Sequence, residues 1–176
     1  MKMDEIDFRM LEILQMDARI PVLDLADRVG LSPTPCARRL RRLESEGIIT
    51  NYCATLNPKA IGLDVTAFVS VRVRHSPEMA AKFTAAIRKM STIRSCYRLT
   101  GSYDYLLRVQ ASDMNSLSHW LQDKLHTIPS VLHTYTSIVM ESIKDEPVFP
   151  LAALAAEEFD ADILAEIRSR PRRSSS

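Results

Sequence analysis

Four arginine side chains lie within a run of five residues: Arg38, Arg39, Arg41 and Arg42. A guanidinium group keeps its positive charge and presents planar N–H donors, which match the oxygens of a phosphate and the edge of a guanine base. The cluster can therefore bind DNA. Arginine is also a good helix former, however, and a charged run is often only the solvated face of a helix. The predicted structure around the arginines distinguishes these two interpretations.

The arginine cluster falls in the second of two short predicted helices that are joined by a tight turn. An apolar repeat at helical spacing predicts the first helix: Val22, Leu25, Ala26 and Val29. Gly30 suits the end of this helix, because glycine readily takes a positive φ. Ser32 is the predicted N-cap of the second helix, and Pro33 stands at its first position, where a missing N–H costs nothing. This helix is predicted to run to about Glu46 and to end at Gly47.

The residues of the second helix divide into an apolar side and a basic side. At about 100° per residue, one side is apolar: Cys36, Ala37, Leu40 and Leu43. Arg38 and Arg42 are predicted to point almost directly away from that side. This arrangement is typical of a helix-turn-helix that places its second helix in the major groove of DNA. The predicted DNA contacts are Ser32, Thr34, Pro35, Arg38, Arg39, Arg41 and Arg42.

A further helix is predicted before this pair. Its apolar residues again recur at helical spacing: Ile6, Met10, Ile13 and Leu14. The sequence Arg19-Ile20-Pro21 ends the repeat. Three short helices can bury a small core, so residues 1–50 are predicted to form a helix-turn-helix DNA-binding domain. Residues 51–63 are predicted to be a strand-like link, with turn signals at Asn57-Pro58 and Gly62.

The composition limits the other function classes. The 176 residues carry a formal net charge of +1, so the positive charge is local rather than spread over the surface. No run approaches the roughly 18 apolar residues of a membrane span, and no basic-then-apolar leader opens the chain, which predicts a soluble cytoplasmic protein. Cys36, Cys53 and Cys96 are scattered, so neither a disulfide framework nor a metal site is indicated, and no cofactor is predicted.

The period of the hydrophobic pattern changes after Gly62. Alternating residues from Val65 to Val73 indicate a strand. The rest of the pattern predicts, in order, a helix after Ser76-Pro77, strands over Ile93–Thr100 and Tyr105–Ala111, a helix capped by Ser112 and ended by Pro129, and a last strand over Val131–Ile143. The order β-α-β-β-α-β predicts a ferredoxin-like sheet with both helices on one face. The fold class is thus α+β, with a three-helix domain before a ferredoxin-like domain.

The sheet face without helices is expected to need a partner. In the last predicted strand both sides carry apolar groups: Thr134, Thr136, Ile138 and Met140 on one side, and Tyr135, Val139 and Ile143 on the other. Helices can cover only one face, and an exposed apolar sheet face is unfavourable in water. We therefore expect the open face to pack on a second copy of the chain, which makes a dimer.

Several segments of the chain, taken together, resemble a known family. They occur in the family's order and spacing over roughly residues 3–151: Asp4-Glu5-Ile6-Asp7, Asp17-Ala18-Arg19-Ile20, Gly30-Leu31-Ser32-Pro33-Thr34-Pro35-Cys36, Arg41-Arg42-Leu43-Glu44, Gly101-Ser102-Tyr103-Asp104-Tyr105 and Val139-Met140-Glu141. The chain is similar to the Lrp/AsnC family of transcriptional regulators. The resemblance implies a winged helix-turn-helix domain and a ligand-sensing, oligomerising domain over residues 64–151. It also implies dimers that assemble into octamers or similar rings, with a small molecule, usually an amino acid, bound between dimers.

The same resemblance implies that the loop before the third strand of the sheet domain binds this effector. A free amino acid offers a carboxylate and an ammonium group; Gly101 lets backbone approach it closely, and Asp104 can accept from the ammonium. The predicted effector-binding residues are Thr100, Gly101, Ser102, Tyr103, Asp104 and Thr136. Asp104 has a second interpretation, because aspartate in such a loop often bonds only backbone. Family members often carry an acidic residue where this chain has Ser102.

The chain continues past the family pattern, over residues 152–176. One amphipathic helix is predicted from an apolar residue at every fourth position: Leu151, Ala155, Phe159, Ile163 and Ile167. This helix is either a strap on its own domain or a contact to a partner or another subunit. The last residues, 168–176, are basic and serine-rich and are predicted to be disordered.

Together these patterns predict a sequence-specific, DNA-binding transcriptional regulator that responds to a small molecule. An enzyme is not predicted, because the sequence contains no Gly-x-Ser-x-Gly elbow, phosphate loop or dinucleotide fingerprint. Two alternatives remain. An amino-acid-binding module that regulates an enzyme leaves the arginine-rich helix without a purpose. An architectural DNA-binding protein binds without sequence preference and without a ligand response.

Overall fold

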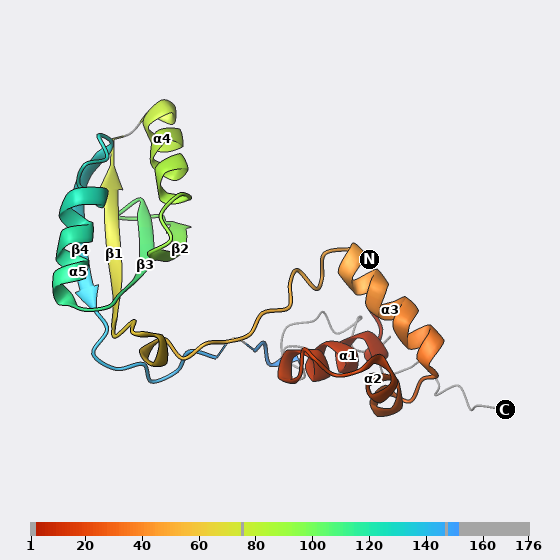
Figure 1. Ribbon diagram of the computed structural model, residues 1–176. Coiled ribbons are helices and arrows are strands. Elements are labelled where there is room, and N and C mark those ends of the chain that lie inside the picture. The colour runs from red at the N-terminus through yellow and green to blue at the C-terminus, as the bar shows by residue number, and fades with distance from the viewer. Residues whose placement is uncertain (1–2, 75, 147, 152–176) are drawn as a thin grey trace. The chain divides into compact units, whose positions relative to one another are not determined.

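The computed structural model describes residues 3–74, 76–146 and 148–151. The chain forms two compact units (Figure 1). The first holds the residues up to Ala54 together with the segment that follows Lys144, and the second runs from Thr55 to Lys144. None of the described helices is long and apolar enough to cross a bilayer. The amphipathic helix and basic tail predicted beyond Leu151 lie outside the described residues.

Three helices make the first unit: α1 (Glu5–Met16), α2 (Val22–Val29) and α3 (Pro33–Ser45). α1 begins with a capping box, in which the carboxylates of Asp4 and Asp7 each accept a hydrogen bond from the other residue's N–H. α2 ends at Gly30, whose φ of 70° confirms the predicted glycine stop. The three helices share one core: Met10, Leu14, Leu25, Ala26, Val29, Cys36 and Leu43. This is the predicted three-helix arrangement.

A late segment of the chain packs with this first unit. The side-chain amide of Gln15 pairs with the backbone of Phe149: Nε2 donates to the carbonyl oxygen at 3.1 Å, and Oε1 accepts from the N–H at 2.7 Å. An open groove lies around this pair, lined by residues of α1 and of the late segment: Glu12, Gln15, Met16, Val148, Phe149, Pro150 and Leu151. The end of the described chain is therefore fastened to α1.

The connection between the two units differs from the predicted strand-like link over residues 51–63. Residues 51–57 have no regular structure, and they lead into a single 3₁₀ turn, η1 (Lys59–Ile61), which ends at Gly62. A strand is stabilised by pairing its N–H and C=O groups with a neighbouring strand. In the part of the chain that the structure describes, the only sheet is four-stranded and does not include this connection.

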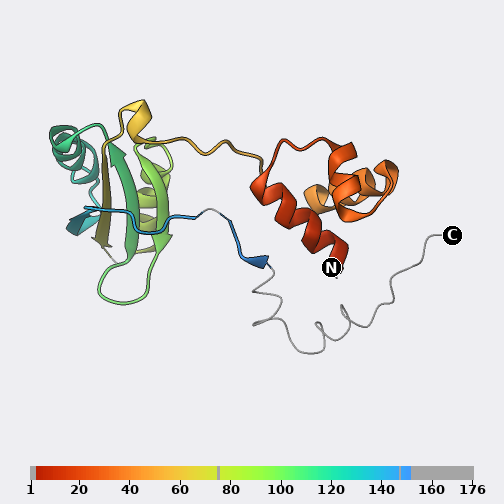
Figure 2. The same cartoon turned by 90° about the horizontal axis from the view of Figure 1, so that it is seen from below.

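The second unit is an antiparallel sheet with its helices on one face (Figures 1 and 2). Its elements follow the predicted order: β1 (Val65–Val73), α4 (Pro77–Ile87), β2 (Ile93–Arg98), β3 (Tyr105–Ala111), α5 (Met114–Trp120), the wider π-helical turn η2 (Leu121–Leu125) and β4 (Val131–Ile138). The strands lie side by side in the order β2-β3-β1-β4. The predicted ferredoxin-like arrangement is confirmed.

The buried face of this sheet forms the core of the second unit. Inward side chains of β1 and β3 meet α4, α5, η2 and the residues that follow: Ala67, Val69, Val71, Val73, Phe83, Ile87, Tyr105, Leu107, Val109, Ala111, Leu117, Trp120, Leu125 and Ile128. The rings of Phe83 and Tyr105 lie with centroids 4.6 Å apart, which joins α4 to β3. Burial of this apolar surface holds the helices on the sheet.

The opposite face of the sheet carries a row of side chains across all four strands. Tyr97 pairs with Leu106, Leu106 with Ser70, and Ser70 with Tyr135. Side chains of directly paired antiparallel residues lie on the same face. Tyr97 and Tyr135 are 56% and 60% exposed in the single chain. A partly apolar sheet face is therefore open to an outside partner.

Two strands end earlier than the sequence predicts. β4 stops at Ile138 rather than Ile143, because the next N–H, that of Val139, already bonds to Thr66 at the start of β1, and little of β1 remains to pair with. β2 stops at Arg98 rather than Thr100, because the turn to β3 begins there. The prediction was wrong at both ends, since alternation can continue past the last available partner.

The helix α5 also begins differently from the prediction. Its N-cap is Asp113, not Ser112: the Asp113 carboxylate accepts a hydrogen bond from the N–H of Ser116 at 2.8 Å. The Ser112 hydroxyl instead donates to the same carboxylate at 3.0 Å. Both Ser112 and Asp113 have side chains that can cap a helix, so the sequence alone did not determine which residue is the N-cap; in the structure it is Asp113.

Candidate nucleic-acid interface

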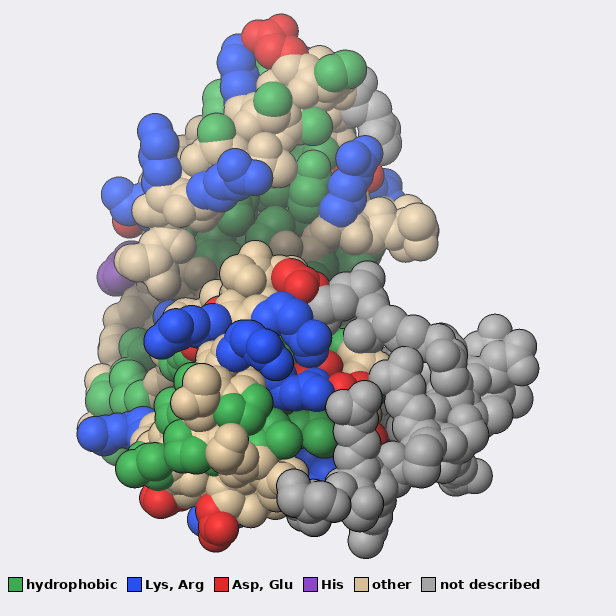
Figure 3. All heavy atoms as spheres, turned by 90° about the vertical axis from the view of Figure 1, so that its right-hand side faces the viewer, with side chains coloured by type: hydrophobic (Ala, Val, Ile, Leu, Met, Phe, Trp, Pro, Cys, Tyr) green, Lys and Arg blue, Asp and Glu red, His purple; other side chains and the backbone are tan. Residues whose placement is uncertain are grey.

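The outward side of α3 and the start of α2 form an open groove. Its lining is partly apolar and partly basic: Val22, Leu23, Pro33, Thr34, Ala37, Arg38 and Arg41. Thr34, Arg38 and Arg41 are exposed. Figure 3 faces the α3 side of the first unit and shows Lys and Arg side chains gathered beside a hydrophobic area. Such a surface offers donors for guanine edges and phosphates and apolar contact for thymine methyl groups.

The sequence around Ser32 sets the start and direction of α3. Ser32 is an extended N-cap residue whose side chain makes no capping hydrogen bond, and Pro33 follows at the first helical position. The first N–H groups of a helix lack partners within the helix and can bind an anion, but Pro33 and Pro35 have no N–H, so in the first turn of α3 only Thr34 can offer one. Cys36 and Leu43 are fully buried and fix which side of α3 faces inward. The Ser32 hydroxyl, which makes no capping hydrogen bond, and the Thr34 N–H are the polar groups that the start of α3 offers to a ligand.

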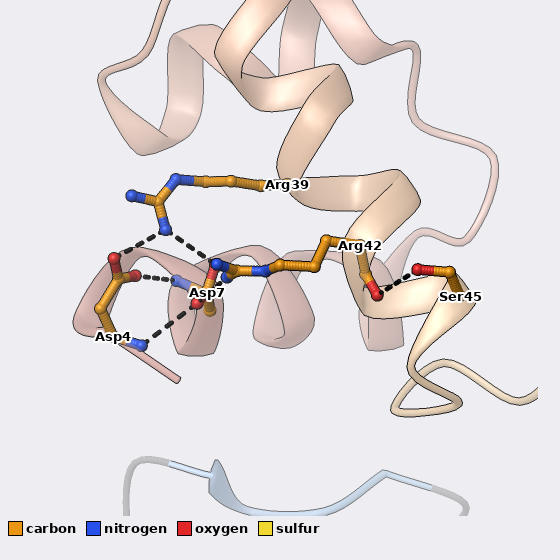
Figure 4. A network of polar contacts seen from close by, with 5 residues as sticks. All are labelled: Asp4, Asp7, Arg39, Arg42 and Ser45. Atoms are coloured by element: carbon orange, nitrogen blue, oxygen red, sulfur yellow. Dashed lines mark hydrogen bonds and ion pairs between the residues drawn. The ribbon is translucent and has the colours of Figure 1, made fainter. Parts of the chain in front are cut away.

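Two of the four clustered arginines turn toward α1 (Figure 4). One guanidinium nitrogen of Arg39, Nη1, lies 2.7 Å from Asp4 Oδ2 and 2.9 Å from Asp7 Oδ1. Arg42 Nη2 forms an ion pair with the other oxygen of Asp7. The Asp7 residue is completely buried. These four side chains form one network of two carboxylates and two guanidinium groups, which we call the Asp7 network.

Charge pairing in the Asp7 network shifts the pKa of two of its members. Burial alone would raise the pKa of Asp4, but the N–H of Asp7 and the guanidinium of Arg39 outweigh it and hold that pKa below its ordinary value. Burial alone would lower the pKa of Arg39, whereas hydrogen bonds to Asp4 and Asp7 raise it. Both shifts favour the charged forms that make the network.

The position of Arg42 differs from the predicted one. The sequence placed Arg38 and Arg42 together on the outermost line of α3, whereas Arg42 lies at the flank and pairs with Asp7. The reason is the location of the buried side: Cys36 and Leu43 define its centre, and about 100° per residue turns Arg38 and Arg41 outward and Arg42 sideways. Pro35, also predicted to contact DNA, is half-buried.

The predicted effector loop is held by β1. Gly101 is exposed and has a φ of 111°, a conformation that other residues rarely adopt. The Asp104 carboxylate accepts a hydrogen bond from the N–H of Val73 at 2.8 Å. Arg72 donates from Nε to the carbonyl oxygen of Ser102 at 2.9 Å, and its guanidinium lies 5.6 Å from the centre of the Tyr103 ring. The loop is thus shaped before any ligand arrives.

One predicted effector residue lies apart from this loop. Thr136 is on β4, whereas the loop joins β2 to β3, and β1 lies between β4 and β3. Neighbouring strands are about 4.8 Å apart, so about 10 Å separates β4 from β3. Thr100, Gly101, Ser102, Tyr103 and Asp104 are contiguous and come together. Within one chain Thr136 does not join them.

Sequence reasoning missed three residues of these regions. Asp7 shares a helical face with the buried Met10 and Leu14, at i, i+3 and i+7, and a carboxylate on an apolar face is a signal that a cation must be near. Leu23 is a large exposed apolar residue beside α3. Arg72 is one of the alternating residues of β1, and nothing in the sequence marks its contact with the distant loop, so no sequence signal could have found it.

Comparison with known proteins agrees with this geometry. Residues 3–50 match the family model described as "Winged helix-turn-helix DNA-binding", and residues 66–149 match the one described as "Lrp/AsnC ligand binding domain". The chain belongs to the Lrp/AsnC family of DNA-binding transcriptional regulators. Membership confirms the resemblance, the fold class and the prediction of a regulator rather than an enzyme.

Relatives of this family member cover nearly its whole described length. The proline dehydrogenase transcriptional activator of Rhizobium radiobacter is 42% identical over 81% of this chain and 92% of its own. The leucine-responsive regulatory protein of Escherichia coli K12 is 40% identical over 81% of this chain and 87% of its own. The crystal structure of a transcriptional regulator of Neisseria meningitidis in complex with L-Met superposes with a TM-score of 0.83 and 38% identity, over 86% of this chain and 99% of that one.

Proposed function

We propose that this regulator binds its operator through the outward side of α3. In this proposal Arg38 and Arg41 donate to base edges or adjacent phosphates, Thr34 lies near the floor of the major groove, and Ser32 bonds a phosphate at the start of the helix. The observation that carries the proposal is the pair of exposed guanidinium groups beside the groove on the second helix of a helix-turn-helix.

The other predicted contacts have a weaker case. Arg39 and Arg42 are already paired with buried or half-buried carboxylates, so their contact with DNA would require those pairs to open. Pro35 has no N–H or side-chain donor. We therefore rank Arg38 and Arg41 first, and assign DNA binding to residues 1–50.

For the effector we propose an amino acid bound at the loop Thr100–Asp104. Asp104 would accept from the ammonium group, the backbone at Gly101 would lie against the ligand, and the hydroxyl groups of Thr100 and Ser102 would bond the carboxylate. Support comes from relatives described as leucine-responsive and from the neighbouring structure with L-Met. Thr136 would join this site from another chain, because β1 separates it from the loop of its own chain.

We propose a homodimer formed by the open face of the sheet, and a higher oligomer such as an octamer built from dimers. The row Tyr97–Leu106–Ser70–Tyr135 supplies the surface that a second copy would cover. Residues 64–151 would then carry both effector binding and assembly. We assign a cytoplasmic location, because a DNA-binding regulator works where the chromosome is and the relatives named above come from bacteria.

The test is DNA binding by fluorescence anisotropy, with the DNA upstream of the protein's own gene and with an unrelated duplex. Arg38→Gln and Arg41→Gln should weaken binding to the first DNA, while Arg94→Gln, an exposed arginine on β2, is the matched control. A panel of amino acids added to the complex tests the effector. Equal affinity for both DNAs without an amino-acid effect would favour an architectural protein, and no DNA binding at all would favour a regulatory module.

A further inference from the structure

The Asp7 network joins the start of α1 to two successive turns of α3. The two oxygens of the Asp7 carboxylate take different partners: Oδ1 accepts from Arg39 at 2.9 Å, and Oδ2 accepts from Arg42. Arg39 and Arg42 are three positions apart on α3, which is nearly one turn. A contact at two points along a helix resists both sliding along its axis and rotation about it.

The Asp7 carboxylate is itself held firmly. Oδ2 also accepts a hydrogen bond from the N–H of Asp4 at 3.1 Å, and the Asp7 N–H donates to Asp4 Oδ1 at 3.0 Å. Asp4 Oδ2 in turn accepts from Arg39 at 2.7 Å. The carboxylate is thus tied to the backbone of α1 at its first turn, where the helix dipole favours negative charge. The carboxylate that contacts α3 is therefore held in a fixed position on α1.

The charges of the network cancel. Two carboxylates face two guanidinium groups, so half of the positive charge in the arginine cluster is neutralised by α1. Asp7 is fully buried, so leaving its carboxylate without a cation is costly. Arg38 and Arg41 form no ion pair among the described residues and stay exposed. The cluster therefore separates into two inward arginines and two outward arginines.

We propose that Asp7 is a positioning residue for DNA recognition. It sets the rotation of α3 so that Arg38 and Arg41 point at the DNA, and it keeps Arg39 and Arg42 from adding unselective contacts to phosphates. Sequence preference then depends on a carboxylate that never touches DNA. The inference rests on the proposed function of α3, and it adds the residue that determines how selectively α3 binds.

The first experiment measures how the affinity of the full chain for DNA depends on salt. The slope of log K against log[salt] is negative, and each lost phosphate contact reduces its steepness by about 0.9. We expect that decrease for any phosphate-contacting member of the outward pair, tested as Arg38→Gln and Arg41→Gln. We expect no change of slope for Arg39→Gln and Arg42→Gln. A loss of steepness in Arg42→Gln as large as that expected for one lost phosphate contact would overturn the proposal.

The second experiment measures selectivity, as the ratio of affinities for a duplex selected from a random pool by the parent protein and for an unrelated duplex of equal length. Asp7→Asn keeps the shape and one acceptor oxygen but removes the charge, and should lower this ratio about tenfold, as much as one mismatched base pair does. Affinity for the unrelated duplex should hold or rise, because Arg42 loses its carboxylate partner, while Arg39 keeps its ion pair with Asp4. A general loss of folding would instead lower both affinities together.

Asp4→Asn is the milder variant, should Asp7→Asn fold poorly, because Asp4 is only partly buried and shares Arg39. It should lower selectivity less than Asp7→Asn and in the same direction. The double variant Asp7→Asn/Arg42→Gln should lose no more selectivity than Asp7→Asn alone, since both act through one contact. Unchanged selectivity in folded Asp7→Asn or Asp4→Asn refutes the positioning role. Unchanged affinity and slope in Arg38→Gln and Arg41→Gln refute the proposed DNA-binding face instead.

Discussion

Arg72 on β1 holds the carbonyl oxygen of Ser102 with two hydrogen bonds, from Nε at 2.9 Å and from Nη2 at 2.5 Å. The two residues are 30 positions apart in the chain, so the loop takes its shape from a strand that lies beside it and not from its own sequence alone. The same guanidinium lies 5.6 Å from the Tyr103 ring centre. The proposed effector loop is therefore fixed from the side of β1.

Gly101→Val should remove the response to amino acids while DNA binding stays. The φ of 111° strains any β-branched residue by about 1–3 kcal/mol, although no atom lies within 4 Å of the added Cβ. Isothermal calorimetry measures ligand binding, and anisotropy measures DNA affinity. The matched control is Gly62→Val, which has a positive φ of 76° outside the loop. If Gly101→Val responds to ligand as the parent does, the effector site is elsewhere.

Arg72→Gln should weaken the amino-acid response by loosening the same loop. Glutamine can replace at most part of the two-donor contact with Ser102, and it loses the charge over Tyr103. DNA affinity without ligand should stay at the parent value, because Arg72 lies in the sheet unit. Calorimetric titration with the amino acid that binds the parent most tightly checks this. An unchanged dissociation constant would show that the loop does not need this support.

Arg42→Gln should destabilise the first unit by about 1–3 kcal/mol, because it leaves the buried carboxylate of Asp7 with one cation fewer. The expected loss of stability is smaller than for a fully buried ion pair, since the Arg42 side chain is 38% exposed. Arg38→Gln, on the exposed side, should change stability by no more than about 0.5 kcal/mol. Urea unfolding of both variants makes the comparison. Equal loss in both would mean that the Asp7 network adds nothing to stability.

Stability in acid should depend on Asp4. Its pKa is lowered in the folded protein, so its ionised form stabilises the fold above the unfolded pKa near 3.8, and this contribution disappears as the pH falls through the folded pKa. Asp4→Asn should therefore lose stability relative to the parent at neutral pH and approach the parent in strong acid. Thermal unfolding between pH 2 and pH 7 tests the sign. A difference in stability between Asp4→Asn and the parent that grows as the pH falls would contradict this prediction.

Assembly should depend on the open face of the sheet. Tyr135→Asp places a charge in the row that a second copy is proposed to cover, and should shift the protein to a smaller species in light scattering. Gln122→Asp, an exposed residue of η2 on the helix side, is the control and should leave the mass unchanged. Residues 60–176 alone should still form a dimer or larger species. A monomer at micromolar concentration would refute the proposed interface.

The parts of the fold that depend on local chemistry were predictable from sequence. Gly30 and Ser32-Pro33 set the turn between α2 and α3, and the alternation from Tyr105 to Ala111 predicted β3 residue by residue. Gly101, which the sequence placed in the loop as a residue without a side chain, has a φ of 111°. These features need only a residue and its immediate neighbours.

The missed features depend on distant partners. Arg42 was assigned outward because the sequence does not show that Cys36 and Leu43 alone define the centre of the buried side of α3, nor that a carboxylate of α1 lies at its flank. The end of β4 depends on where β1 begins, and the separation of Thr136 from the loop depends on the strand order. The candidate DNA face was thus partly predictable. The outward directions of Arg38 and Arg41 follow from rotation about the axis of α3, whereas the ion pairs of Arg39 and Arg42 follow from the packing of α3 against α1.

The pairing of Gln15 with Phe149 means that the DNA-binding unit is not contiguous in the gene. The polypeptide passes between the units twice, after Ala54 and again after Lys144. A single protease nick in the first connection would leave the two halves covalently joined through the second. A chimaera that grafts only the first 54 residues onto another sensor would strip α1 of its Phe149 partner. Such a graft has to carry the segment that follows Lys144 as well, or the side-chain amide of Gln15 loses both of its hydrogen bonds to the backbone of Phe149.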